Sequence, residues 1–220
     1  MITYQLTSRH IIAGSLKTVL PEFYKLSSVV EINPWHNKQN VFEHTMNVLS
    51  SLERIILFDF LAGDRKLKLE KELLQEINGH TRKELLIVAT LLHDCGKEKT
   101  LIIDHRTRQT NCPNHELIGS ELANKYCKRL YITGIANSRV RRIIILHGYP
   151  HEVVNQVLSH DVPEKYFEVF ARKVKSIYLE LLLLGYADTL GSNLITNNPT
   201  ETAAREHIYQ DALTRFAASL

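Results

Sequence analysis

The chain has 220 residues, of which 44% are apolar and 23% charged, and its net charge of +3 is only mildly basic. This composition is typical of a soluble globular protein with enough chain for one domain with a sizeable core or two small ones. The weak positive charge indicates a solvated surface more readily than an anionic ligand. The most apolar stretch, IYLELLLLGYA, is too short and, with Glu180, too charged to span a bilayer, so we expect no membrane partner.

The cysteines and the N-terminal segment indicate the compartment in which the protein is expected. Cys95, Cys112 and Cys127 are odd in number and form no C-x-x-C motif, which argues against a disulfide framework or a zinc ribbon and fits a reducing compartment. Arg9 precedes the run IIAGSLKTVL, but Lys17 interrupts it and no convincing cleavage site follows. We therefore expect no signal peptide and a cytoplasmic location.

Apolar residues recur at helical spacing along the chain, while glycine (9) and proline (6) are sparse. We predict an all-α fold in a single domain, residues 1–220, without an internal repeat and without an Asn-Gly hairpin. The predicted helices, in chain order, cover 15–30, 40–60, 64–80, 82–94, 114–130, 137–147, 151–158, 164–188 and 199–218. The segments 33–40 (NPWHNKQN) and 104–114 (DHRTRQTNCPN) are predicted loops, and Gly96 is a predicted C-terminal cap.

One predicted helix ends in an unexpected way. Its apolar run LLIVATLL stops at His93 and Asp94, followed by Cys95, Gly96 and Lys97. Burying an unpaired charge costs several kcal/mol. Removing one partner of a buried ion pair costs about 3–5 kcal/mol. The imidazole and the carboxylate therefore need a partner from elsewhere in the chain.

Further residues of the ligand type lie at comparable places. The chain has 11 histidines, and neutral imidazole is the commonest metal ligand. Residues at the ends of apolar helices can converge deep in a helical bundle. A divalent cation would neutralise the carboxylates and accept lone pairs from the imidazoles, with Mn, Fe, Co, Ni, Zn or Mg as suitable ions. The candidate ligands are His44, His93, Asp94, His115, His147 and Asp188.

Each of these residues also has an ordinary structural interpretation. A single histidine on an apolar helix is more often a hydrogen-bonded core residue than a ligand, and Asp188 alone could cap a helix or bond a tyrosine. Cys95 is expected to be a small hydrophobic residue. The hypothesis of a metal site therefore depends on the co-occurrence of the candidates. The other histidines are predicted to lie at the surface: His10, His36, His80, His105, His151, His160 and His207. Among them, exceptions are expected first at His36 and His105, since each lies in a loop near the proposed site.

The order H…HD…D, carried by His44, His93-Asp94 and Asp188, resembles the signature of the HD-domain metal-dependent phosphohydrolases. LLHDCGKEKT is similar to the HDIGK core of that family. NPWHNKQNVFEHTMNVL, PNHELIGSELA, the ILH before Gly148 and YADTLGSN resemble the HD region behind the nucleotidyltransferase domain of bacterial tRNA nucleotidyltransferases and poly(A)-polymerase-like proteins. The resemblance covers residues 33–195, so 1–32 and 196–220 are expected to be peripheral helices. We find no Gly-rich turn with paired acidic residues, and so expect a free-standing HD domain without nucleotide addition.

The resemblance implies an HD-type helical bundle with a metal site between its central helices, and hydrolysis of phosphomonoesters or phosphodiesters. His44, His93, Asp94 and Asp188 would then hold one metal ion, while His115 and His147 would hold a second ion or contact the phosphate. Asp94 could also bridge two ions and orient the nucleophilic water.

Three basic features could contact the substrate. Lys97 would stabilise charge on the phosphoryl oxygens, or be a solvated lysine. Arg106 and Arg108 could clamp a phosphate, although plain surface charge is the commoner role. The cluster SRVRR, ending at Arg142, could follow a nucleic-acid backbone but more readily forms a solvated face.

The expected function is metal-dependent hydrolysis of a small phosphoester, namely a nucleotide or nucleoside cyclic phosphate, with a dinucleoside polyphosphate as a further possibility. Two alternatives stay open at this point. One is a non-catalytic HD module that binds a nucleotide or a partner, and the other is a di-iron oxygenase using the same ligands. The sequence leaves the oligomeric state and the choice between one and two metal ions open.

Overall fold

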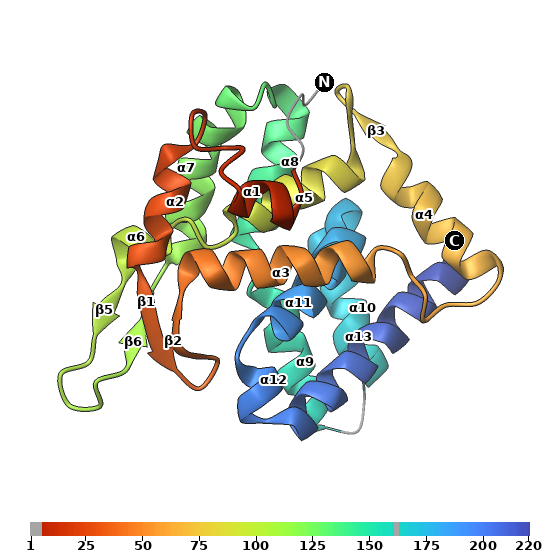
Figure 1. The fold of residues 1–220 in the computed structure, drawn as a ribbon. Coiled ribbons are helices and arrows are strands. Elements are labelled where there is room, and N and C mark those ends of the chain that lie inside the picture. Colours follow the sequence, from red (N-terminus) through yellow and green to blue (C-terminus); the bar gives the residue numbers. More distant parts are fainter. Residues whose placement is uncertain (1–5, 161–162) are drawn as a thin grey trace.

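The computed structural model describes residues 6–160 and 163–220, and its architecture is predominantly helical, which confirms the predicted all-α class (Figure 1). Residues 1–5 of the predicted peripheral segment lie outside the described residues. The helices are α1 (Ser8–Ile12), α2 (Pro21–Lys25), α3 (Val41–Ile55), α4 (Asp64–Leu74), α5 (Arg82–Leu92), α6 (Lys97–Thr100), α7 (His115–Arg129), α8 (Gly134–Ile145), α9 (Tyr149–Ser159), α10 (Pro163–Val174), α11 (Tyr178–Gly191), α12 (Leu194–Asn197) and α13 (Pro199–Ser219), with 3₁₀ turns η1 (Leu26–Ser28) and η2 (Lys175–Ile177).

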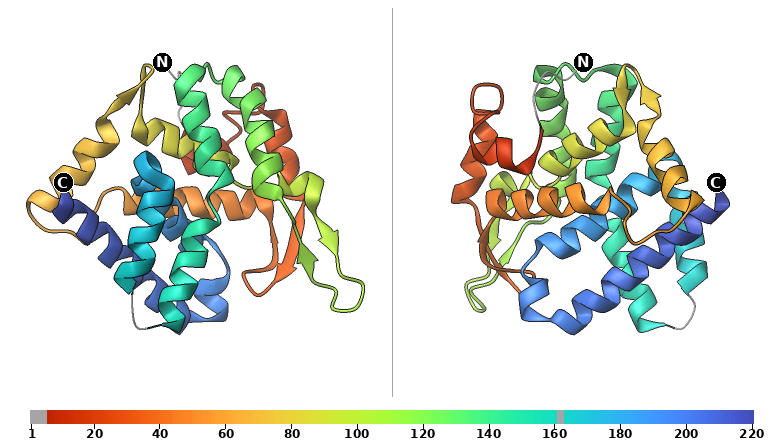
Figure 2. Two further views of the ribbon diagram at one scale, coloured as in Figure 1. Left: turned by 180° about the vertical axis from the view of Figure 1, so that it is seen from behind. Right: turned by 45° about the vertical axis from the view of Figure 1, so that its right-hand side comes forward.

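Helices α3 and α11 form the centre of the core, where they pack along one another. Nearly every side chain of α11 is buried, including Leu181–Leu184, as expected of a helix surrounded by protein on all sides. The two helices approach closely at Gly191, where an added Cβ would lie 2.6 Å from the backbone N of Val48. Helices α7 and α8 pack against each other behind this pair, and α8 also packs on α5 (Figure 2). None of the described helices is long and apolar enough to cross a membrane.

Local signals explain where the two helices nearest the site begin. Asn40 caps α3 by accepting a hydrogen bond from the backbone N–H of Glu43 at 2.8 Å. Thr81 and Glu84 form a reciprocal capping box at the start of α5. Both helices therefore have fixed first turns, which sets the register of the residues that follow.

The sequence-based expectation was wrong about short strands, because the described part of the chain contains three antiparallel hairpins. The predicted helix 15–30 is replaced by α2, η1 and the start of β1, and the predicted loops 33–40 and 104–114 hold strands. The predicted helix 64–80 ends at Leu74, and Asn78 and Gly79 turn the chain with φ of +52° and +79°, as a type I′ hairpin requires. The strands are β1 (Val30–Asn33), β2 (His36–Asn40), β3 (Glu76–Ile77), β4 (His80–Thr81), β5 (Ile102–Ile103) and β6 (Thr110–Asn111).

Two further expectations need correction. The predicted helix 164–188 is interrupted by η2, where Lys175 has a φ of +53° that a continuous helix does not allow, so α10 and α11 are separate. Gly96 is not a left-handed cap, since its φ is −74°. Glycine is required there because an added Cβ would lie 2.1 Å from the carbonyl oxygen of His115, where α7 begins.

Candidate metal centre

The six predicted ligands come from the ends or first turns of five segments of the bundle. His44 lies in the first turn of α3, His93 and Asp94 follow α5, and His115 is the first residue of α7. The remaining two residues occupy similar positions, because His147 follows α8 and Asp188 lies in the last turn of α11. The packing of α11 on α3 and of α7 and α5 on α8 brings these segments to one place.

The Asp94 carboxylate lies at the centre of this cluster and faces histidines on both sides. Its Oδ2 atom is 3.5 Å from Nε2 of His44 and 3.3 Å from Nε2 of His93. Its Oδ1 atom is 3.4 Å from Nε2 of His115 and 3.6 Å from Nε2 of His147. The two carboxylate oxygens thus lie next to two different pairs of imidazoles.

The ligand atoms fall into two groups, each with its members within 4.8 Å of one another. One group consists of His44, His93 and Asp188, and the other of Asp94, His115 and His147. Within the first group, Nε2 of His44 is 2.9 Å from Oδ1 of Asp188. Either group has the histidine and carboxylate composition that first-row divalent ions accept.

Backbone contacts fix the tautomers of three of these rings. Nδ1 of His93, His115 and His147 lies 2.7, 2.8 and 2.7 Å from the carbonyl oxygen of Thr90, Cys112 and Ile144. A carbonyl oxygen only accepts, so Nδ1 carries the proton and the neutral ring keeps its lone pair on Nε2. This arrangement is the one that metal-ligating histidines adopt.

The arrangement of these atoms fits a cation. Nε2 of His115 and Nε2 of His147 are 3.3 Å apart, so two lone pairs would face each other without a proton or a cation between them. Among the described residues, the buried atom His93 Nε2 has no hydrogen-bond partner. Buried polar atoms normally have partners, so this exception indicates a missing ligand.

The charges of the cluster also favour a bound cation. Burial raises the pKa of Asp94, but the neighbouring His93 and Lys97 outweigh this effect and hold the pKa well below its usual range. Burial likewise lowers the pKa of His93, yet the charge of Asp94 raises it to about 9. The Asp94 carboxylate therefore favours a positive charge within the cluster. A bound divalent cation would provide this charge in place of a proton on His93.

Lys97 is buried, not solvated, with only 6% of its surface exposed. Its Nζ lies 2.8 Å from Oδ2 of Asp94 and 2.8 Å from Oε2 of Glu31. Burial alone would lower the pKa of Lys97, but these two carboxylates raise it, so the side chain remains a cation. The structure thus places a fixed positive charge beside the candidate ligands.

Two adjoining cavities open beside the cluster. The first, of about 290 Å³, is lined by His44, Asp94, His147, His151 and Asp188 among others, and we call it the ligand lobe. The second, of about 280 Å³, lies between hairpins β1–β2 and β5–β6, and we call it the hairpin lobe. The residues that line both lobes are Trp35, His36, Lys97 and His115.

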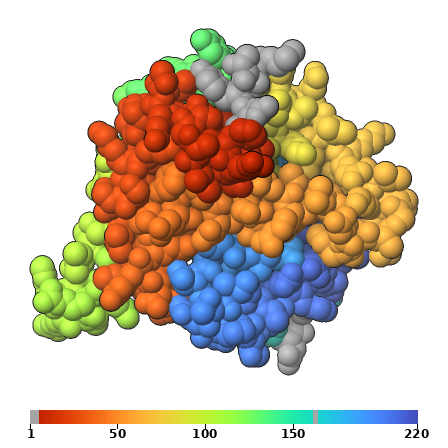
Figure 3. All heavy atoms as spheres, viewed as in Figure 1, coloured from red at the N-terminus to blue at the C-terminus, as the bar shows by residue number. Residues whose placement is uncertain are grey.

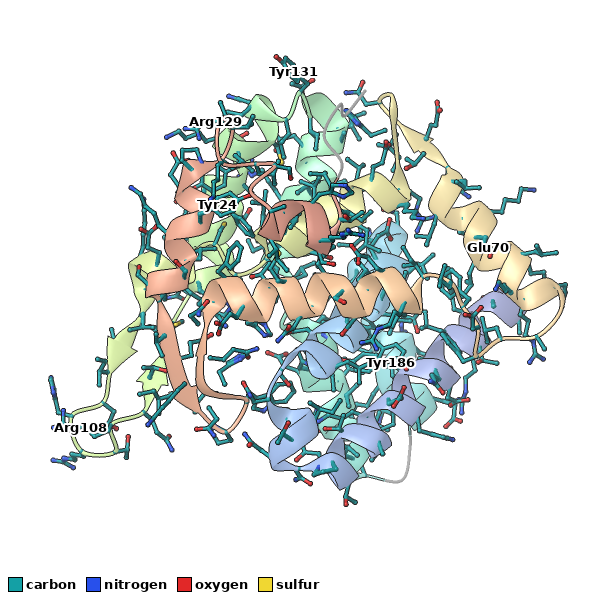
Figure 4. The ribbon with its side chains drawn as sticks, in the orientation of Figure 1. Tyr24, Glu70, Arg108, Arg129, Tyr131 and Tyr186 are labelled. Atoms are coloured by element: carbon teal, nitrogen blue, oxygen red, sulfur yellow. The ribbon has the colours of Figure 1, made fainter. Side chains whose placement is uncertain are left out.

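The arginines that were predicted to contact substrate are not brought to the cluster. Arg106 and Arg108 are exposed and line neither lobe. Figure 4 shows Arg108 at the tip of the β5–β6 hairpin, which projects from the body of the molecule in Figure 3. In the SRVRR segment, Arg139 pairs with the buried Glu180, and Arg142 donates to the carbonyl of Val174, so this segment is largely engaged in the fold.

Three histidines that were predicted to lie at the surface are buried or half-buried. His80 is 4% exposed and lies in β4, while His36 is 8% exposed and lies with its ring 4.4 Å from that of His44. His151 lines the ligand lobe, and its Nε2 is 2.8 Å from Oδ2 of Asp188. His151 follows the predicted ligand His147 by only four residues, across the turn between α8 and α9, and this closeness was the available signal for the last of these. The histidines that are exposed as predicted are His10, His105, His160 and His207.

Cys95 is buried with 4% of its surface exposed, and burial raises the pKa of its thiol. It is therefore a neutral thiol, in keeping with the small hydrophobic residue that we expected.

Together, the all-α bundle and the two histidine-carboxylate groups define a helical protein with side chains that could hold divalent metal ions. The sequence model of the HD domain matches residues 41–192, which is most of the chain, so the protein belongs to the HD domain family. This family consists of metal-dependent phosphohydrolases, and the matched range contains all six predicted ligands. The more specific resemblance to tRNA nucleotidyltransferases remains a prediction.

Proposed function

We propose that this protein is a divalent-metal-dependent phosphohydrolase that acts on a nucleotide or a nucleoside cyclic phosphate. The observation that carries the proposal is the position of the Asp94 carboxylate, whose two oxygens face two different pairs of imidazole Nε2 atoms. The family supplies the reaction class, and the size and lining of the two lobes support a small substrate.

In this proposal His44, His93 and Asp188 hold one ion, and His115 and His147 hold a second. Asp94 belongs to the second group, and its Oδ2 atom also faces Nε2 of His44 and His93, so this carboxylate would join the two groups. When bound, such ions lower the pKa of a water molecule from about 15.7 towards about 7 and stabilise negative charge on phosphoryl oxygens. The backbone carbonyls that accept from Nδ1 keep the rings oriented for this task.

Lys97 is the residue that we propose to stabilise charge on the substrate. Its ammonium lines both lobes and is held by Asp94 and Glu31, so it needs no large rearrangement when charge develops on a phosphate. Asp94 orients the attacking water as well as the ions. Arg106 and Arg108 stay candidates for contact with parts of a substrate that extend beyond the lobes.

The lobes together suit a nucleotide in size. Ligand pockets for small molecules are typically about 300–1,000 Å³, and the two adjoining lobes of about 290 and 280 Å³ fall in this range when joined. Trp35 is half-buried between them and offers an aromatic surface. The Arg205 guanidinium lies over this ring, 5.0 Å from its centre.

The test is a hydrolysis screen of bis-p-nitrophenyl phosphate, of ribonucleoside 5′-monophosphates and of nucleoside 2′,3′- and 3′,5′-cyclic monophosphates with Mn, Co, Ni, Zn or Mg. Asp94→Ala should lose more than about 100-fold in kcat/KM, because removal of groups that merely orient ligands already costs about 10- to 100-fold. Asp59→Ala is the matched control, since this carboxylate is 75% exposed. Turnover by none of the metal-loaded samples would instead support the non-catalytic binding module. Equal turnover by wild type and Asp94→Ala would show that the measured hydrolysis does not come from this centre and would contradict the proposal.

A further inference from the structure

The hairpin lobe is a preformed cavity whose two walls are tied together. The backbone N–H of Ile32 in β1 donates a 2.7 Å hydrogen bond to Oγ1 of Thr110 in β6. This bond bridges the two hairpins, so the lobe does not depend on a ligand to hold its walls side by side. Glu31, His36 and Lys97 provide buried polar groups on its inner side.

Gln39 fixes which nitrogen of His36 faces the lobe. The Gln39 amide donates through Nε2 to the carbonyl oxygen of Gly191 at 3.4 Å, so its Oε1 atom is left as an acceptor. Nδ1 of His36 donates to this Oε1 at 3.3 Å. The lone pair of His36 is therefore on Nε2, the atom on the side of Glu31.

Two hydrogen-bond acceptors thus lie next to each other in the lobe. Nε2 of His36 is 3.8 Å from Oε2 of Glu31, which is too long for a hydrogen bond between them. A group that satisfies both atoms must bring its own donors. The pair is not suited to a metal ion, because the Lys97 ammonium is 2.8 Å from the same carboxylate oxygen. The Glu31 carboxylate in turn disfavours a phosphate at this position.

We propose that the hairpin lobe binds the sugar of a ribonucleoside 5′-phosphate, the nucleotide form of the proposed substrate, with its free 2′- and 3′-hydroxyls donating to His36 Nε2 and to Glu31. This inference rests on the proposed function, because it places the sugar next to a phosphate in the ligand lobe. A neutral group with two adjacent O–H donors matches two adjacent acceptors flanked by charges of both signs. Trp35, which lines both lobes, supplies an apolar surface beside the sugar.

The experiment is a calorimetric or NMR titration of the protein with adenosine, guanosine, cytidine and uridine, and with their 2′,3′-dideoxy counterparts. Nucleosides contain no phosphate ester, so this titration measures the lobe independently of turnover. At least one ribonucleoside should bind about tenfold or more tightly than its dideoxy form, since each hydroxyl contributes one hydrogen bond. A site built to bond a hydroxyl rejects analogues that lack it.

His36→Phe keeps an aromatic ring but removes the acceptor, and it should reduce the preference for the ribose form to within about twofold. Glu31→Gln replaces one acceptor oxygen by a donor and should reduce the preference in a second, independent way. Asn37→Ala, exposed on the same hairpin, is the matched control and should keep the preference.

The inference is overturned if no ribonucleoside binds, if the dideoxy forms bind equally well, or if His36→Phe and Glu31→Gln keep the wild-type preference. Failure of the proposed function has a different signature, namely the absence of hydrolysis of every phosphoester in the separate screen. Hydrolysis of bis-p-nitrophenyl phosphate without any preference for ribose would leave the phosphohydrolase in place and remove the sugar site.

Discussion

Two clusters of charged side chains are buried in this helical core, and they differ in how completely their groups are paired. In the first, Glu180 accepts from Nε of Arg82 at 2.9 Å and from Nη2 of Arg139 at 2.6 Å, and Arg82 also pairs with Glu72. In the second, around Asp94, carboxylates and imidazole lone pairs face one another, and the buried Nε2 atom of His93 lacks a hydrogen-bond partner among the described residues.

The difference in pairing separates a cluster that stabilises the fold from one that is suited to bind a ligand. The arginine-glutamate cluster has two cations for two carboxylates, so it is complete without any ligand and serves the fold. The Asp94 cluster has an excess of acceptors, which the Lys97 ammonium does not balance. An incomplete buried cluster is stable only when something else supplies positive charge, and this is the physical basis for a metal centre.

The largest effect on stability is expected in the complete cluster. Glu180→Ala leaves Arg82 and Arg139 buried without their shared partner and should lower the free energy of unfolding by about 3–5 kcal/mol. Chemical denaturation measures the loss. Glu121→Ala, at an exposed position of α7, is the control and should change little. A loss below about 1 kcal/mol for Glu180→Ala, as is usual for surface pairs, would contradict this interpretation.

A smaller effect is expected at the edge of the incomplete cluster. His151 Nε2 donates to Oδ2 of Asp188 at 2.8 Å and so orients this carboxylate towards His44. His151→Ala should weaken metal binding by about 10- to 100-fold without comparable loss of stability. Calorimetric titration with Mn or Co measures the affinity. The exposed His160 provides the control His160→Ala, and equal affinities of the two variants would show that His151 does not position Asp188.

The smallest effect concerns an ion pair near the surface, which provides a contrast to both buried clusters. The Arg129 guanidinium, through its hydrogen bonds, lowers the pKa of Glu22 from 4.5 to about 2. A lowered pKa stabilises the fold above about pH 4.5, and this contribution is lost as the pH falls towards 2. Because Glu22 is partly exposed, the contribution is about 1 kcal/mol or less. Glu22→Gln should remove it, so wild type and variant should converge in stability at low pH.

Helical spacing was sufficient to predict the main helices and the all-α class. The sequence analysis failed where structure depends on contacts between distant segments, as in β1, whose Ile32 bonds Thr110 in β6. Such short strands carry little periodicity of their own. The Asn78-Gly79 turn had a recognisable signal, but the helical pattern of the preceding charged segment was extended across it.

All six predicted ligands lie close together. Four of them lie at the ends of apolar runs, a pattern that is visible in the sequence: His93, Asp94, His147 and Asp188. The residues that support them were less visible. His36 lies in a segment predicted as a loop, and its burial follows from the hairpin that carries it. Lys97 could not be distinguished from a solvated lysine, because its burial depends on Glu31, which is 66 residues away in the chain.

The most direct test of the metal centre is elemental analysis of protein purified without an affinity tag, with Asp94→Ala in parallel. The two ligand groups predict two divalent ions per wild-type chain and their loss in the variant. A single ion would confine the centre to His44, His93, Asp94 and Asp188. No ion in either protein, and none after reconstitution with Mn, Co, Ni or Mg, would contradict the metal centre and with it the proposed hydrolysis.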